Sequence, residues 1–247
     1  MPFRSLDATK ILATAQHLER RVATRFPDRG LRKVAAEIVA LTETTMAETQ
    51  ALQPPIWWLR GLIGAVVLTG TGVFVMVGNI VPLNQIGRES LGSVQNVEAA
   101  INTALLGGLG LTALIRLEAR SKRQRVARGL HGLRAVIHVI DMHQLTKDPV
   151  TLMPEYVPTA ASPDRAFGPG DLARYLDYCS ELLAITGKPA ALYAQAVPDD
   201  GVAQTVNDIE TLGSNLSRKV WQKIMMIEGM AVPERHRRPA TKAATPE

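Results

Sequence analysis

The sequence is poor in the residues that stabilise small secreted domains. Cysteine occurs once in 247 residues, at Cys179, so no intramolecular disulfide can form. A catalytic thiol would need a paired histidine and a lowered pKa, and the sequence shows neither, so we interpret Cys179 as a small buried or half-buried thiol. Aromatic residues make up only 4% of the chain.

Recognised catalytic and nucleotide-binding motifs are also missing. The sequence contains no Walker loop, dinucleotide fingerprint, nucleophile elbow, kinase signature or series of zinc ligands. We therefore assign no catalytic residue, expect no cofactor and no metal, and consider that the sequence weighs against an enzyme. The first residues lack the three regions of a signal peptide, so we expect the chain to begin in the cytoplasm.

Apolar residues are concentrated in two segments. Residues 56–81 carry Arg60 as their only charge, and residues 99–115 carry none. A helix needs roughly 20 apolar residues to span a bilayer. A soluble chain of 247 residues has too small a core to bury a helix that is apolar on all sides. The sequence therefore predicts an all-α integral membrane protein with a two-helix transmembrane hairpin (54–118), whose spans cover about 56–81 and 99–117.

Basic residues flank the hairpin on its outer sides, whereas the segment of residues 82–98 has only Arg88 against Glu89 and Glu98. The positive-inside rule then predicts a multi-pass protein of the cell inner (plasma) membrane with both termini in the cytoplasm. We expect a set of basic residues to contact lipid headgroups or another anion. They are Arg60, Arg120, Lys122, Arg123, Arg218, Lys219 and Lys223.

Small residues recur every four positions in both apolar segments. Stripes of this kind let helices approach closely where no hydrophobic effect drives them together in lipid. We therefore expect one stripe to pack within the hairpin and the other to join a neighbouring copy, giving a homo-oligomer. The stripes are Gly61, Ala65 and Thr69 in the first segment, and Ala100, Ala104, Gly108 and Thr112 in the second.

Helical periodicity predicts cytoplasmic helices on both sides of the hairpin. Residues 1–53 form an N-terminal helical pair. Residues 119–229 form a stalk, a proline-rich strap and further helices, and should pack with the N-terminal pair into one bundle. In this part, glycines at positions 129 and 132 weaken the stalk helix, a helix runs from Asp171 to about Pro189, and the last helix covers about 201–228. Residues 230–247 should be a disordered basic tail.

Four polar residues share one side of the stalk helix, within an arc of about 80°. They are His131, Arg134, His138 and Asp141. This face could bind a ligand or sense pH, because imidazole changes charge near neutral pH. The simpler alternative is a solvated polar face of an amphipathic helix. His131 and His138 are two turns apart, too far to share one metal ion without a second helix.

Three functions remain open from the sequence. The first is an oligomeric two-span inner-membrane protein whose cytoplasmic bundle regulates or senses, with a pore-forming or effector role. The second is a membrane-anchored scaffold that recruits a cytosolic protein. The third is a membrane-bound enzyme that uses His131, His138 and Asp141. The expected partners are the lipid bilayer, further copies of the chain and a cytosolic protein, whereas nucleic acid is not expected.

Overall fold

The computed structural model describes residues 5–52, 57–80, 90–162 and 167–237. Within these residues the chain forms seven helices and no strand, which confirms the predicted all-α class. The chain divides into two compact units. The bundle unit comprises Met1–Ala51 and Val126–Glu247, and the apolar unit comprises Leu52–Arg125.

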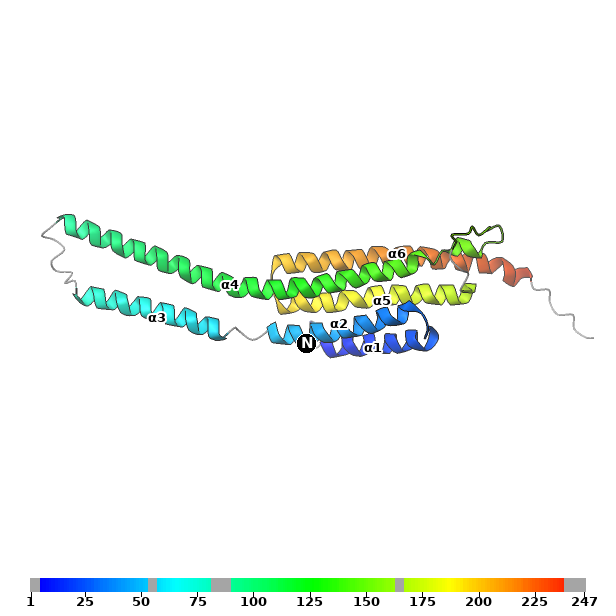
Figure 1. Ribbon diagram of the computed structural model, residues 1–247, viewed down its shortest axis with the longest axis horizontal. Helices are drawn as coiled ribbons and strands as arrows, with labels where there is room; N and C mark the ends of the chain where they lie inside the picture. The colour runs from blue at the N-terminus through cyan, green and yellow to red at the C-terminus, as the bar shows by residue number, and fades with distance from the viewer. Residues whose placement is uncertain (1–4, 53–56, 81–89, 163–166, 238–247) are drawn as a thin grey trace, which may run out of the picture. The chain divides into compact units, whose positions relative to one another are not determined.

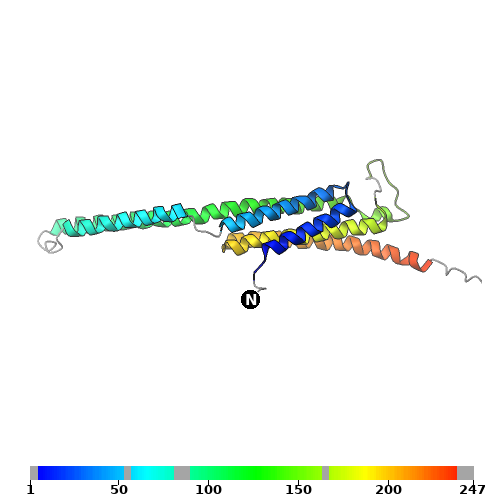
Figure 2. The same cartoon turned by 90° about the horizontal axis from the view of Figure 1, so that it is seen from below.

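The bundle unit consists of long helices that lie lengthwise beside one another (Figures 1 and 2). Its elements are α1 (Ala8–Arg25), α2 (Gly30–Leu52), the C-terminal part of α4 (Ser90–Leu145), the short 3-10 helix η2 (Pro149–Leu152), α5 (Pro169–Ala196) and α6 (Asp200–Arg237). Helices this long and close in sequence bury their apolar faces by packing antiparallel to their neighbours.

Helix α1 follows directly from its sequence. The Asp7 side chain accepts hydrogen bonds from the backbone N–H groups of Thr9 and Lys10, which caps the first turn. Leu12, which the sequence also places on the apolar face, is half-buried, whereas four other apolar residues that recur at helical spacing are buried. These residues are Ile11, Ala15, Leu18 and Val22. One face of α1 is therefore committed to the core.

Helix α5 is the central element of the bundle unit. Fourteen of its 28 residues are buried, and they point in several directions around the helix. Helices α1, α2, α4 and α6 each contribute a side chain or close approach to it. The contacts are Arg21 of α1 to Glu181, Glu48 of α2 to Tyr193, Gly129 of α4 against Tyr193, and Ser217 of α6 to Ser180.

The limits of α5 differ from those expected. The helix begins at Pro169 with Gly168 as its N-cap, instead of being capped by Asp171, and it continues through Pro189 to Ala196. Proline inside a helix removes one backbone hydrogen bond and usually breaks or kinks the helix. Ala190 and Tyr193, both 0% exposed, lie beyond the proline, so burial on that side keeps the last turns helical.

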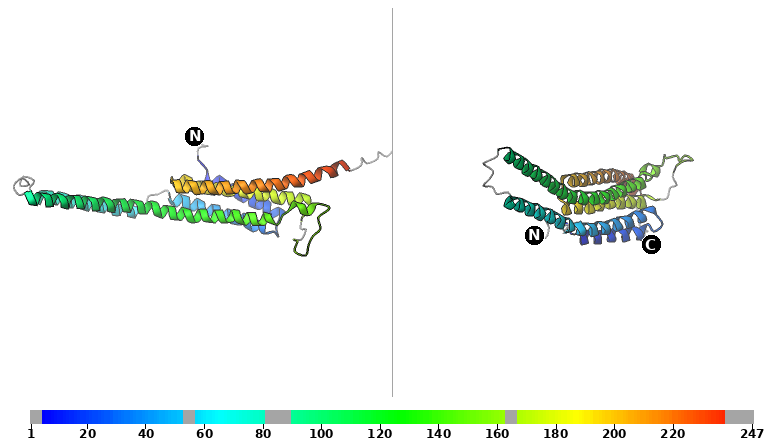
Figure 3. Two further views of the ribbon diagram at one scale, coloured as in Figure 1. Left: turned by 90° about the horizontal axis from the view of Figure 1, so that it is seen from above. Right: turned by 60° about the vertical axis from the view of Figure 1, so that its left-hand side comes forward.

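Helix α6 packs antiparallel to α5 after a short connection (Figure 3). Apolar residues follow one another along α6 in steps of three and four, as in a coiled coil, and every residue of this seam is buried. The seam is Val202, Val206, Ile209, Gly213, Leu216, Val220, Ile224 and Ile227. The helix extends to Arg237, so it includes residues 230–237 that we had expected in the basic tail, and residues 238–247 lie outside the described part.

The apolar unit contains α3 (Trp57–Ile80) and the N-terminal part of α4. In the described residues, no helix combines the length and the apolar character that crossing a membrane requires. This finding contradicts the predicted transmembrane hairpin.

Because the transmembrane hairpin is contradicted, the predicted location in the inner membrane is wrong as well. Placement in the inner membrane as a multi-pass protein, with both termini in the cytoplasm, rested on two spanning helices. The count of apolar residues over 56–81 and 99–117 predicted two spanning helices, but the described residues contain none. Residue 81 and residues 82–89 of the intervening segment lie outside the described part of the chain, and α4 begins at Ser90.

Tyr193 explains one of the two glycines in the stalk. The Tyr193 hydroxyl donates a hydrogen bond to the Glu48 carboxylate of α2. A Cβ atom on Gly129 would lie 2.5 Å from Tyr193 Cζ and closer still to its hydroxyl oxygen. Glycine is therefore required at position 129 so that α4 can pass beside the tyrosine, although it weakens the helix itself.

Replacing Gly129 with alanine should destabilise the protein by about 1–3 kcal/mol, because Tyr193 must move and lose its bond to Glu48. Gly132→Ala is the matched control on the same helix. Its new Cβ would meet only Leu41 Cδ2, at 3.4 Å, so it should be neutral or stabilise by up to about 1 kcal/mol. Urea unfolding of both variants measures the difference, and equal effects would contradict this packing.

Candidate functional site

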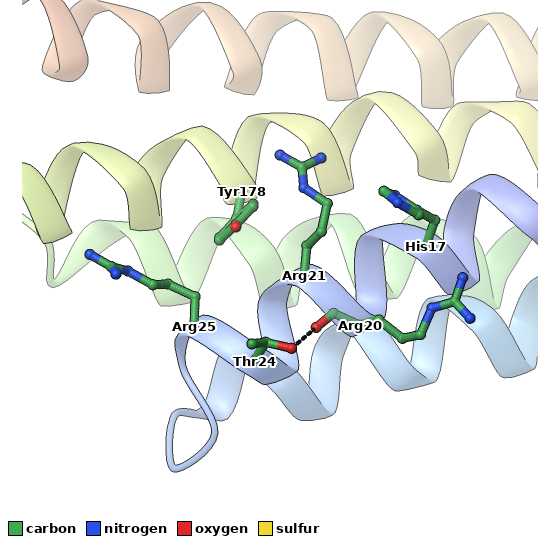
Figure 4. Close-up of a pocket in the computed structure, with 6 residues that line it drawn as sticks. All are labelled: His17, Arg20, Arg21, Thr24, Arg25 and Tyr178. Carbon is green, nitrogen blue, oxygen red and sulfur yellow. Dashed lines mark hydrogen bonds between the residues drawn. The ribbon is translucent and has the colours of Figure 1, made fainter.

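A surface groove lies between α1 and α5 (Figure 4). It has a volume of about 490 Å³. The residues that line this α1 groove are His17, Arg20, Arg21, Thr24, Arg25 and Tyr178. Five of them come from successive turns of α1, because positions three and four apart share one face of a helix. The groove is therefore a basic strip of one helix set against the flank of another.

Two of the three arginines are held by carboxylates of α5. Arg21 donates to both oxygens of Glu181, at 2.7 and 3.0 Å, and its guanidinium lies 5.2 Å from the centroid of the Tyr178 ring. The hydrogen bonds to Glu181 raise the pKa of Arg21. Arg25 pairs with Asp171 at 2.5 Å. These pairs fix α1 against α5 and neutralise part of the groove.

Arg20 and His17 are the groove's cationic or titratable groups that remain available. Both are exposed, and the described residues place no carboxylate within 4 Å of either side chain. The Arg20 carbonyl accepts a hydrogen bond from the Thr24 hydroxyl at 2.8 Å, as the dashed line in Figure 4 shows. The guanidinium of Arg20 itself is therefore free to meet an acidic group from outside.

A second polar cluster joins α4 to α6. Lys223 Nζ donates to the backbone oxygen of Gln144 at 2.8 Å and to its side-chain oxygen at 2.7 Å. The Gln144 amide in turn donates to Asp141 at 2.6 Å. Burial lowers the pKa of Lys223, since the charged form is poorly hydrated there. Lys223 therefore links α6 to α4 within the bundle unit. We had expected it to contact headgroups or an anion.

The predicted polar face of α4 lies on the outside of the bundle unit. His131, Arg134 and His138 are exposed, and none of them has a hydrogen bond or ion pair in the described structure. Asp141 is half-buried and bonded to Gln144. Within the described residues, no group of three or more potential metal-binding side chains comes together. Among the described residues, His131, Arg134 and His138 therefore form an open helix surface, whereas Asp141 at the end of the face belongs to the cluster with Gln144 and Lys223 of α6.

The small residues predicted to pack lie open where they are described. A Cβ atom on Gly61 or Gly108 would meet no atom within 4 Å. Ala65, Thr69 and Thr112 are exposed, and the Thr112 hydroxyl donates to the Gly108 carbonyl at 2.7 Å. The side chains of Ala100, Ala104 and Arg60 lie outside the described part. These stripes are therefore not filled from within the chain at the described positions.

The other basic residues expected to contact anions are spread over both units. Arg120 is exposed on α4, and Arg218 and Lys219 are exposed on α6. Lys122 and Arg123 each take part in an interaction within the structure.

Sequence reasoning missed the role of His143. Its ring lies against α2, because a Cβ on Gly30 would be 2.5 Å from His143 Cε1, and its Nδ1 is 3.5 Å from the Tyr175 hydroxyl. Burial first, and the Lys147 cation second, lower the pKa of His143 below its ordinary value of 6.5. Its position on the apolar side of α4 was the only signal in the sequence.

Arg21→Ala should destabilise the protein by about 1 kcal/mol, because the half-exposed pair with Glu181 and the contact with Tyr178 are lost together. Arg20→Ala removes the same side chain one position away and should change the free energy of unfolding by less than about 0.5 kcal/mol. Urea unfolding compares the two. A larger loss in Arg20→Ala would contradict the assignment of Arg21 as the fixed partner.

Stability should fall as the pH drops through about 6.5, because the unfolded chain then binds a proton that folded His143 resists. The lowered folded-state pKa sets this direction. We expect His143→Gln to weaken the fall in the free energy of unfolding between about pH 7.5 and about pH 5.5. His138→Gln, on the exposed face, should keep the wild-type dependence. Identical profiles for wild type and His143→Gln would overturn this.

Comparison of the chain with protein-family models, with curated proteins and with solved structures finds no match. No functional residue can therefore be carried over from a relative. What the protein does has to be argued from its own exposed surfaces and charges.

Proposed function

We propose that the protein is a self-associating helical scaffold, in which the apolar unit joins copies of the chain and each copy displays its bundle unit. One observation carries this proposal: large apolar side chains are exposed along both helices of the apolar unit. They include Leu62, Val66, Val67, Leu68, Val75, Met76, Ile101, Leu105, Leu106 and Leu109.

The exposure of these side chains is large. Leu68 is 75% exposed and Leu106 is 72% exposed, whereas the apolar seams of the bundle unit are buried. Covering apolar surface contributes roughly 25 cal/mol per Å². Contiguous apolar surface on a folded protein marks a place where something else binds. Burial of this apolar surface against another molecule is therefore strongly favourable.

A second copy of the chain is the covering that the chemistry favours. Residues 61–87 and 99–115 contain no charged side chain, so a charged partner finds no complement there. Glycines on both helices leave open space where a Cβ would stand, which lets another helix approach closely. They are Gly61, Gly64, Gly70, Gly72, Gly107, Gly108 and Gly110. Identical surfaces meet readily in symmetric homo-oligomers.

Sedimentation equilibrium of the full chain tests the proposal. Wild-type protein should have a molar mass that is a multiple of the 26.8 kDa chain mass. Gly108→Leu places a bulky side chain in the open stripe, and should shift the mass toward that of the single chain. Gly229→Leu makes the same substitution on α6, also in open space, and should leave the mass unchanged.

Two results would contradict self-association through the apolar unit. One is a wild-type mass of 26.8 kDa at every concentration. The other is an equal loss of assembly in Gly108→Leu and Gly229→Leu. Either would show that the exposed apolar residues do not join copies of the chain.

A further inference from the structure

A second cavity lies at the turn between α1 and α2, next to the α1 groove. It has a volume of about 370 Å³ and is lined by residues 25–29 together with Phe167 and Asp171. Its aromatic wall is firmly placed, because the Phe167 ring packs 5.7 Å from Phe26 and 5.2 Å from Tyr175, measured between ring centroids. We call this the Phe167 cavity.

Two cations converge on the Phe167 ring. The Arg29 guanidinium lies 4.8 Å from the ring centroid and Lys147 Nζ lies 5.3 Å from it. They come from different segments, the α1–α2 turn and the stretch after α4. No carboxylate in the described residues lies within 4 Å of either cation. Burial and the nearby Arg29 lower the pKa of Lys147, as expected for like charges held together.

The ends of two helices add positive potential to the same place. Helix α2 begins at Gly30, directly after Arg29, and α5 begins at Pro169, two residues after Phe167. No side chain caps the start of α5. Uncapped N–H groups at a helix N-terminus favour an anion. The start of α2 thus reinforces the charge of Arg29 more than the start of α5 does, because Pro169 has no N–H and Asp171 already places a carboxylate in the first turn of α5.

Two carboxylates belong to the cavity, and they act differently. Asp171 is already paired with Arg25 at 2.5 Å, so this pair is neutral as a unit. Asp28 is exposed and has no cation within 4 Å among the described residues. Within the lining, Arg29 and Asp28 therefore balance, and the additional positive charge comes from Lys147, which contacts the Phe167 ring without lining the cavity. Asp28 opposes any anion that enters.

We propose that the Phe167 cavity binds a small molecule through its phosphate group, with Arg29 and Lys147 as the charged contacts. Guanidinium and ammonium donors form short, charge-assisted hydrogen bonds to phosphate oxygens. The bound phosphate relieves the repulsion between the two cations. Phe167 holds both cations in place and forms the wall against which the rest of the molecule lies.

Isothermal titration calorimetry of the full chain with inorganic phosphate and with glycerol 3-phosphate, at constant ionic strength, tests this site. Arg29→Gln and Lys147→Gln should each weaken binding by about tenfold or more. Asp28→Asn should tighten binding, because it removes the opposing charge. Arg134→Gln, an equal change of charge on the exposed face of α4, should leave the affinity unchanged.

Arg29→Gln and Asp28→Asn should change the affinity in opposite directions, which makes the test specific. Saturable binding that weakens in Arg29→Gln and tightens in Asp28→Asn would support the site. Absence of saturable binding of either compound to the wild type would overturn it, as would equal weakening in Arg134→Gln and Arg29→Gln. The glutamine and asparagine variants replace exposed or half-buried polar groups, and circular dichroism checks that each one folds.

Discussion

The bundle unit depends on the burial of α5 on several sides at once. Four helices reach this one helix, so the surface that each of them buries is set by where α5 places its residues. Tyr193 illustrates the constraint. Its ring occupies the space beside Gly129, and its hydroxyl meets Glu48 of α2, so one side chain fixes the approach of two helices. The ion pair of Arg21 with Glu181 fixes α1 in the same way.

The two units differ in how far they bury their apolar side chains. In the bundle unit, the apolar stripes of the helices face each other, and large residues such as Ile137 and Ile209 are 0% exposed. In the apolar unit, leucines and valines remain exposed and the glycines between them are open. Apolar side chains that stay exposed in one part of a folded protein offer a surface on which a further molecule can bind. Self-association is the simplest way to satisfy that surface.

Local patterns in the sequence predict which face of a helix is buried, but not which other helices pack against that face. The seam of α6 and the buried face of α1 could be predicted, because helical spacing is encoded by nearby residues. The passage of α5 through Pro189 could not, since it depends on packing beyond the proline. The same holds for the Arg21–Glu181 pair, whose members are 160 positions apart. The predicted transmembrane hairpin was wrong. It rested on a count of apolar residues along the sequence, whereas the described residues contain no helix that is long and apolar enough to cross a membrane.

Cross-linking through one introduced cysteine tests self-association most directly. Burial raises the pKa of the native Cys179 thiol to about 12, so it stays unreactive and can remain in place. Under mild oxidation, Leu106→Cys on α4 should form disulfide-linked dimers of the full chain, whereas Met225→Cys, 60% exposed on α6, should not. Dimers from Met225→Cys alone, or no dimers from Leu106→Cys, would contradict association through the apolar unit.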